Sequence, residues 1–124
     1  MKFTAKILGR PVVKKNTQRV IRSGGRTFVI YSKKYAAWKN SAILQLRAQG
    51  SSGVSFDKPV NAEFRFYFEN HSAEPDLGNV GEGCADILQE LGVLANDRLI
   101  HILRLEKHFG ETPRMEIEIT EIVA

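Results

Sequence analysis

The chain has 124 residues, of which 43% are hydrophobic and 26% are charged, and its formal net charge is +4 at pH 7. This length and composition are typical of one globular domain with a single core, so residues 1–124 are interpreted as one domain. No apolar run reaches the ~18 residues of a membrane span, no apolar leader follows Met1, and Cys84 has no second cysteine, so we expect a cytoplasmic protein without disulfides.

The first elements that the sequence predicts are a strand and a hairpin. Residues 2–8 alternate between apolar and polar side chains, as a half-buried strand does. Residues 19–31 place β-branched residues on both sides of a Ser-Gly-Gly-Arg sequence at 23–26, which tolerates the positive φ angles of a tight turn. Both arms carry arginine, so we expect a basic hairpin that projects from the body.

The middle of the chain predicts a helix and a second strand. Residues 32–49 have helical periodicity, with Ser32 as the N-cap and Gly50 as the stop. Residues 60–68 alternate cleanly, with three phenylalanines on the apolar side. This alternation predicts a strand with one buried face.

The last part of the chain predicts another helix and two more strands. Residues 79–91 carry an apolar stripe at helical spacing and end at Gly92. Residues 99–105 predict a largely buried strand, and residues 115–120 predict a final strand that pairs antiparallel with it. The order of elements predicts an α+β fold, a two-layer β-α-β-α-β-β domain with the basic hairpin projecting from it.

Positive and negative charges are segregated along the chain. Residues 1–49 hold 12 of the 18 Lys and Arg residues and no acid, a net +12, whereas residues 50–124 hold the other 6 bases and all 14 acids, a net −8. A region of one sign attracts phosphates and releases their counterions, although a merely solvated surface can have the same composition. The candidate DNA contacts near the hairpin and the first helix are Arg10, Lys14, Lys15, Arg19, Arg22, Arg26, Lys33 and Lys34.

Four acidic residues of the second half are candidate metal ligands. Asp76 follows the strand at 60–68, Glu82 and Asp86 share the polar stripe of the second helix, and Asp97 precedes the next strand. Carboxylate oxygens bind Mg²⁺ and Mn²⁺, which can activate water and neutralise charge at a phosphodiester. We expect adjacent strands to bring the ends that carry Asp76 and Asp97 together.

Each of these acids also has an ordinary structural interpretation. Asp76 could form an Asx-turn or cap the helix, and Asp97 could cap a turn. Asn79 and Glu82 have the spacing of a capping box, and Asp86 is ordinary on an exposed helix face. The residues alone leave the metal site and these structural roles open.

Motifs along nearly the whole chain resemble the RusA-type Holliday-junction endonucleases, which are small resolvases of phages and prophages. Pro75-Asp76-Leu77-x-Asn79 is similar to the signature turn of that family. Residues 86–94 are similar to its helix end and residues 96–100 to its second acidic motif. Further similarities are the start of the first helix at 31–38, Lys107 on the following strand and the closing strand at 114–121.

The resemblance implies a RusA-like fold with a mixed sheet and a homodimer that nicks two opposed strands of a four-way DNA junction. It implies Mg²⁺ as the cofactor, with Mn²⁺ as a substitute, and Asp76 and Asp97 as metal ligands. Asp86 matches an aspartate of the family on the helix.

Two positions differ from the family pattern. Gly78 stands where the family commonly has a second aspartate, and Glu82 stands where it commonly has a lysine. Because helical side chains lean toward the N-terminus, the carboxylate of Glu82 can reach the space that an aspartate at 78 would fill. We therefore expect Glu82 to replace the missing ligand, while the role of the missing lysine passes to Lys107 or to no residue.

Three functions are open at this point. The leading one is a metal-dependent endonuclease for branched DNA, in which Asp76, Glu82, Asp97 and Lys107 are catalytic. The second is a junction-binding protein of the same fold, weakened or inactivated by Gly78 and Glu82. The third is a nucleic-acid chaperone or RNA-binding protein that uses only its basic face.

Overall fold

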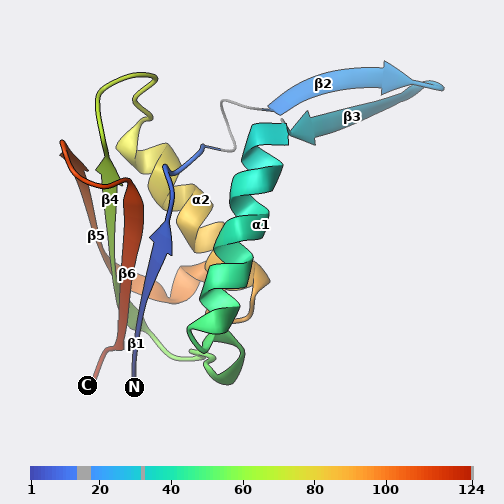
Figure 1. Cartoon of the computed structure of the whole chain (residues 1–124). Coiled ribbons are helices and arrows are strands. Elements are labelled where there is room, and N and C mark those ends of the chain that lie inside the picture. The colour runs from blue at the N-terminus through green and yellow to red at the C-terminus, as the bar shows by residue number, and fades with distance from the viewer. Residues whose placement is uncertain (14–17, 32, 124) are drawn as a thin grey trace.

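The computed structural model describes residues 1–13, 18–31 and 33–123. Two α-helices pack on one face of a four-stranded sheet, and a two-stranded hairpin stands away from this body (Figure 1). This arrangement confirms the predicted α+β class and the mixed sheet. The predicted N-cap Ser32 lies outside the described residues, as do Lys14 and Lys15.

The sheet has the strand order β1-β6-β4-β5. β6 (Arg114–Glu121) runs antiparallel to both β1 (Lys2–Leu8) and β4 (Val60–Phe68), whereas β4 and β5 (Ile100–Phe109) are parallel. Parallel neighbours need a crossover connection, and the helix α2 supplies it. The prediction that the last two strands pair with each other is wrong, because β6 lies between β1 and β4.

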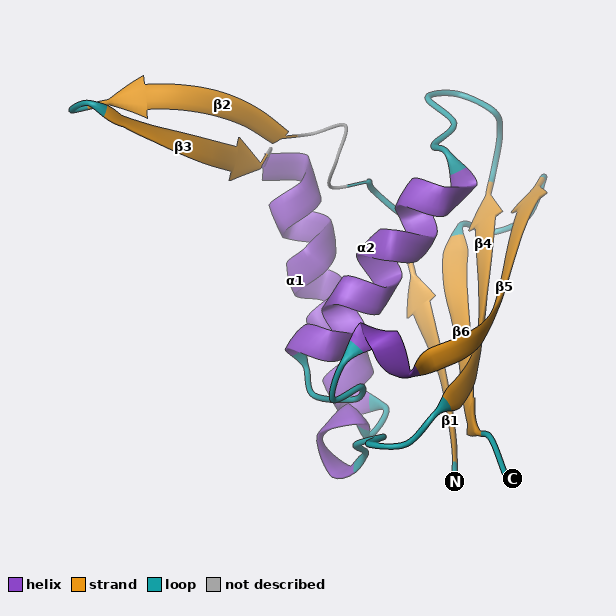
Figure 2. Ribbon diagram, turned by 180° about the vertical axis from the view of Figure 1, so that it is seen from behind, coloured by secondary structure: helices purple, strands orange, loops and turns teal. Residues whose placement is uncertain are grey.

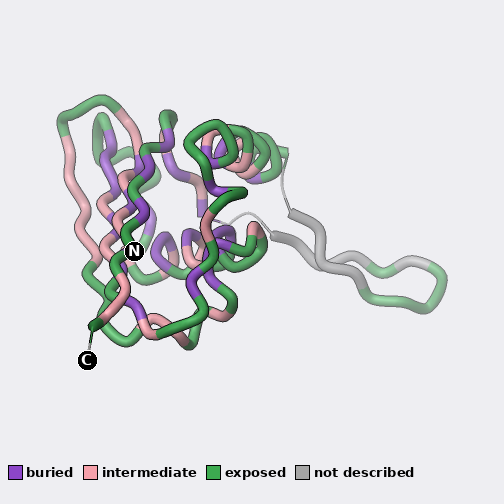
Figure 3. Tube along the Cα trace, turned by 90° about the horizontal axis from the view of Figure 1, so that it is seen from below, coloured by how far each residue is buried: buried purple, intermediate pink, exposed green. Residues whose placement is uncertain are grey.

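The predicted hairpin is confirmed. β2 (Gln18–Ser23) and β3 (Arg26–Tyr31) pair around Gly24 and Gly25, whose φ angles are 59° and 79°. Two successive positive φ angles are those of a type I′ turn, which matches the twist of the flanking strands. The hairpin extends well beyond the helices and the sheet (Figures 1 and 3).

The core lies between the sheet and the helices α1 (Lys33–Ala48) and α2 (Leu77–Glu90), which cover the same face (Figure 2). Phe64, Phe66 and Phe68 of β4 are fully buried there, as predicted from their alternation. A Cβ at Gly81 of α2 would lie 2.7 Å from Leu105 Cδ1 of β5. The missing side chain therefore lets α2 approach β5 closely.

α2 ends at Glu90, one residue before the predicted end, and Gly92 is confirmed as the residue that stops it. The N–H of Gly92, whose φ is 78°, donates to Gln89 O at 3.0 Å, and the N–H of Val93 donates to Leu88 O at 2.9 Å. These two bonds form a Schellman motif, which favours glycine at the left-handed position. The start of the helix was predicted at residue 79 but lies at Leu77.

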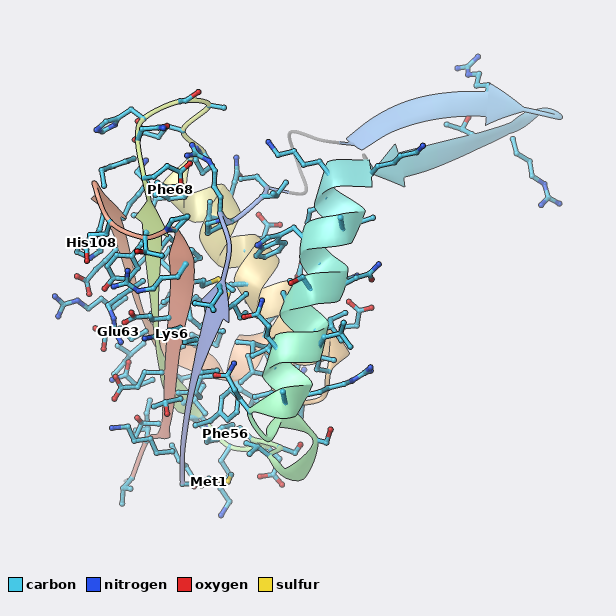
Figure 4. All side chains as sticks on the ribbon, in the orientation of Figure 1. Met1, Lys6, Phe56, Glu63, Phe68 and His108 are labelled. Atoms are coloured by element: carbon cyan, nitrogen blue, oxygen red, sulfur yellow. The ribbon has the colours of Figure 1, made fainter. Side chains whose placement is uncertain are left out.

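The expectation of a largely buried strand at 99–105 is wrong. β5 lies at the edge of the sheet, where β4 is its only partner among the described strands, and residues 101–104 are exposed. An apolar run has the same appearance in an edge strand as in an interior one, so its composition predicted burial. The face of the sheet away from the helices is charged, with Glu63 and His108 among its side chains (Figure 4).

The described helices are short. The longer of them, α1, has 16 residues, and none of the helices in the described segments combines the length and apolar composition of a membrane span.

Candidate functional site

Asp76 occupies the N-cap position of α2. Its Oδ1 accepts the N–H of Gly78 at 3.0 Å, and its backbone is extended, so the capping role that its sequence position allowed is present. The residue is exposed. A carboxylate has about four acceptor positions on two oxygens, so capping one N–H leaves the others available to a ligand.

The turn before Asp76 is anchored by Lys107 of β5. Lys107 Nζ donates to Pro75 O at 3.1 Å and forms an ion pair with Glu74 Oε1 at 2.7 Å. Glu74 Oε2 lies 3.0 Å from His71 Nδ1, and the His71 ring stacks on Phe109 with centroids 3.8 Å apart. These contacts fix the loop that leads into the helix.

The ionised form of Glu74 is favoured by this anchor. The hydrogen bond from Lys107 is the main cause that lowers the pKa of Glu74, followed by the hydrogen bond to His71. Because the folded-state pKa is depressed, the anchor is complete above the ordinary pKa of a glutamate and is lost as the pH falls through the lowered value.

Arg10 holds the same loop from its other side. Its guanidinium binds Glu69 and the carbonyl oxygen of Ser72, and it lies over the ring of Phe68 at 5.1 Å from the centroid. Arg10 was predicted to contact DNA, and the structure engages its donors within the loop. A contact of Arg10 with DNA stays a prediction.

Glu82 and Asp86 are exposed on successive turns of α2. Since Asp76 is the N-cap, Asn79 lies inside the helix, and the capping-box interpretation of Glu82 is wrong. A Cβ added at Gly78 would lie 3.6 Å from Asp76 Oδ1, an ordinary contact. A carboxylate that reaches the space above Gly78 would therefore lie next to that of Asp76.

Asp97 begins a short 3-10 helix, η2 (Asp97–Leu99), beyond the other end of α2. Its N–H donates to Gln89 Oε1 at 2.7 Å, and the cap of η2 is Asn96, whose Oδ1 accepts the N–H of Arg98 at 2.9 Å. The capping interpretation of Asp97 is therefore wrong, and the residue is exposed.

The expected meeting of Asp76 and Asp97 does not occur within one chain. Because β4 and β5 are parallel, the end of β4 and the start of β5 lie at opposite ends of the sheet. Asp76 caps one end of α2 and Asp97 follows the other end, and a helix of 14 residues is about 21 Å long. The described residues of one chain include no group of three or more His, Cys, Asp or Glu side chains that could hold a metal ion.

The donor set nevertheless has the chemistry of a magnesium site. The candidate ligands on and around α2 are carboxylates, which supply the hard oxygen atoms that Mg²⁺ and Mn²⁺ prefer. The three positions Asp76, Glu82 and Asp97 are exposed, so a second molecule can approach them. The residues fit the ion by type, but one chain does not bring Asp76 and Asp97 together.

The predicted basic residues lie on the hairpin and beside the Asp76 turn. Arg22 and Arg26 are exposed on the hairpin, and Lys33 and Lys34 are exposed at the start of α1. Arg19 lies in β2, but its side chain is outside the description. Lys34 lines a hollow of about 330 Å³ together with Arg10, Val12, Glu74 and Pro75.

Two residues that position the candidate site were not identified from the sequence. Glu74 anchors Lys107, and Gln89 holds the backbone of Asp97. Glu74 lies close to the Pro75-Asp76 turn in sequence, which is a weak signal. The position of Gln89 near the helix end gives no signal in the sequence. Its contact with the N–H of Asp97 depends on how the chain folds back after Gly92.

The sequence model of one protein family matches residues 9–120, and that family is described as endodeoxyribonuclease RusA. The match includes the hairpin, α2, Asp97 and β5. No curated protein matches the chain.

Proposed function

Because the chain belongs to the RusA endodeoxyribonuclease family, we propose that it is a Mg²⁺-dependent nuclease that resolves four-way DNA junctions. It acts as a homodimer in the cytoplasm and makes two symmetric nicks. The observation that carries this proposal is the Asp76 turn. Lys107 anchors this turn through Pro75 O and Glu74, the carboxylate of Asp76 is exposed, and the turn lies beside the hollow that Lys34 lines. The basic side chains supply phosphate contacts next to the acidic ones, as a nuclease for DNA requires.

The dimer is part of the proposal because neither chain can assemble the acidic site alone. Asp76 and Asp97 are separated by the length of α2, about 21 Å. A two-fold axis that sets α2 antiparallel to the same helix of a second copy brings Asp76 of one subunit toward the partner's Asp97, and does so twice. Two equal sites related by symmetry would nick two opposed strands of a junction.

The acidic residues have distinct roles in this composite site. Asp76, Glu82 and the partner's Asp97 would hold the ion, with Asp86 one turn further along α2. When bound, Mg²⁺ supplies a water of lowered pKa and neutralises charge on the scissile phosphate. Lys107 is a positioning residue, because it fixes the turn before Asp76 through Pro75 O and Glu74.

Glu82 compensates for Gly78 in this proposal. The space at position 78 adjoins Asp76 Oδ1, and Glu82 lies one helical turn after it with its side chain leaning back toward that turn. If Glu82 does not reach this space, Gly78 leaves the site one ligand short. The protein would then be the weakened or inactive junction-binding protein, which is the alternative function.

The function is tested on a synthetic four-way junction with Mg²⁺, with Mn²⁺ and with a chelator. We expect paired nicks with either ion and none with the chelator. Tight junction binding without nicking in either metal would contradict the nuclease and favour the junction-binding alternative. Equal affinity for duplex, junction and RNA, again without nicking, would favour a general nucleic-acid binder.

Substitutions on the hairpin are expected to change the salt dependence of junction binding. Each phosphate that a basic side chain neutralises contributes about −0.9 to the slope of log K against log salt concentration. Each substitution is present in both subunits of the homodimer, so Arg22→Ala and Arg26→Ala should each make that slope shallower by about 1.8. Both side chains are exposed, so folding should be unaffected.

The matched control is Arg47→Ala. Arg47 is also exposed, but it lies in the last turn of α1, away from the hairpin (Figure 1). The salt-dependence slope of Arg47→Ala should equal that of the wild type. Hairpin variants that keep the wild-type slope would show that the hairpin does not contact phosphates.

A further inference from the structure

A hollow of about 330 Å³ lies beside the Asp76 turn. It is lined by residues 10–13 after β1, by Lys34 at the start of α1 and by residues 73–75 of the loop between β4 and α2. Asp76 follows this last segment directly in the chain. A group bound in the hollow would therefore lie next to the exposed carboxylate of the turn.

The loop side of the hollow is held in one conformation by two cations. Arg10 donates to the carbonyl oxygen of Ser72, and Lys107 donates to that of Pro75. Between these two contacts Ala73 has a φ of 50°, a left-handed conformation that is unfavourable for a residue with a Cβ. Strained backbone that its surroundings hold in place is typical of binding and catalytic sites. The hollow is thus preformed for a ligand.

The charged side chains around the hollow leave one cation without a counterion. Arg10 pairs with Glu69, and Lys107 pairs with Glu74 at 2.7 Å. Lys34 is exposed, and it forms no ion pair or hydrogen bond with the residues that the structure describes. Three cations and two anions give this group a net charge of +1. The excess charge is on Lys34, so the hollow attracts an anion.

We propose that the hollow binds the phosphate of the DNA strand that adjoins the scissile one, and that Lys34 contacts this phosphate. The proposal rests on the proposed function, because it takes the Asp76 turn as the place where a strand is nicked. Phosphates follow each other along one strand with a rise of about 3.4 Å. A strand that presents one phosphate to Asp76 therefore carries its neighbour to an adjoining site.

The other two cations at the hollow are not available for this phosphate. Lys107 Nζ already makes two contacts with the loop, and its side chain is 22% exposed. The guanidinium of Arg10 is also engaged by the loop, and its side chain is likewise 22% exposed. Lys34 has a free ammonium with three donors on a flexible stem, which suits a phosphate whose oxygens face several directions. Lys34 therefore contacts the substrate, whereas Lys107 and Arg10 position the loop.

The hollow also lies where DNA bound by the hairpin would reach the Asp76 turn. β3 ends at Tyr31 and α1 begins at Lys33, so the hairpin leaves the body beside Lys34 (Figure 1). Residues 11–13 give the hollow an apolar wall, against which the carbon atoms of a deoxyribose can pack. Contacts to phosphate and sugar position a strand without reading its bases. The effect of Lys34 should therefore depend on the place of the phosphate and not on the base sequence.

The test combines Lys34→Ala with neutral linkages in a synthetic four-way junction. One methylphosphonate per junction removes the charge of a single phosphate, at each position near the crossover in turn, and binding is measured with a chelator. We expect one position where the neutral linkage weakens wild-type binding about fivefold, the size of one exposed charge pair. The same linkage should weaken Lys34→Ala by less than about twofold, because its contact is already missing. At the other positions both proteins should lose affinity equally.

Lys33→Ala and Lys58→Ala are the matched controls. Lys33 is the exposed neighbour of Lys34 but does not line the hollow, and Lys58 is exposed before β4, at the opposite end of that strand from the Asp76 loop. Both variants should keep the wild-type loss at the position that Lys34 selects. Thermal melting checks that each variant is folded. A Lys34→Ala protein that responds to every linkage as the wild type does would overturn the proposal, and so would a Lys33→Ala protein that abolishes the same effect.

Nicking of the unmodified junction in Mg²⁺ is measured separately on the same samples. The position that Lys34 selects should adjoin the nicked phosphate, and a position elsewhere would overturn the proposed placement. A protein that shows the effect of Lys34 in binding but does not nick would contradict the proposed function while supporting the phosphate site. Nicking by a protein whose binding shows no position that depends on Lys34 would support the function and overturn the phosphate site.

Discussion

Asp76→Asn is expected to lower the rate of junction nicking by more than about a hundredfold while junction affinity stays close to that of the wild type. Even partners one step removed from a metal ligand cost about 10–100-fold, so a ligand should cost more. Asparagine is as good an N-cap as aspartate, so α2 should keep its start at Leu77 and its stability. Asp97→Asn should have the same effect on nicking for the same reason.

The measurement is single-turnover nicking at saturating Mg²⁺, with junction binding and thermal melting on the same samples. Glu118→Gln is the control, because Glu118 lies in β6 and pairs with Lys2, away from α2. It should nick at the wild-type rate. An Asp76→Asn protein that nicks normally would remove Asp76 from the site.

Glu82→Gln should lower nicking at least about tenfold, and Glu82→Lys should lower it further, because a cation then replaces an anion beside the metal site. Restoring activity with a second substitution tests this role more specifically than losing activity with the first. Gly78→Asp adds a Cβ that meets only Asp76 Oδ1 at an ordinary 3.6 Å, so the helix can accept it. In the Glu82→Lys background, Gly78→Asp recreates the usual family pattern, and we expect it to restore nicking.

Glu90→Gln provides the matched control for Glu82. Glu90 lies two turns further along the same exposed stripe, and its carboxylate pairs with Lys39 of α1 at 2.7 Å. Glu90→Gln should nick junctions at the wild-type rate. Wild-type nicking by both Glu82→Gln and Glu82→Lys would mean that Glu82 does not compensate for Gly78.

Local signals predicted most of the elements, because their causes are local. Adjacent glycines at 24 and 25 favour a tight turn, alternation across residues 60–68 gives a strand with one buried face, and Gly92 ends α2. The position of each strand in the sheet depends on long-range pairing. For that reason the apolar run of β5 predicted burial, although the strand forms an exposed edge.

The candidate site was predictable residue by residue but not as an arrangement. The residues that surround Asp76 and Asp97 identify them as candidates, whereas their distance depends on whether β4 and β5 are parallel. Parallel pairing separates the two acids by the length of α2. The contact of Lys107 with Glu74 also depends on the parallel pairing, because that pairing makes β5 end beside the loop that follows β4.

The composite site can be tested by mixing two inactive proteins. In a heterodimer of Asp76→Asn with Asp97→Asn, a site shared between subunits is doubly altered on one side and intact on the other. After subunit exchange, half of the dimers should carry one intact site, so nicking should recover to about a quarter of the wild-type rate. A site built within one chain has no intact copy in any of these dimers. We predict recovery, and a mixture as inactive as its two components would contradict the shared site.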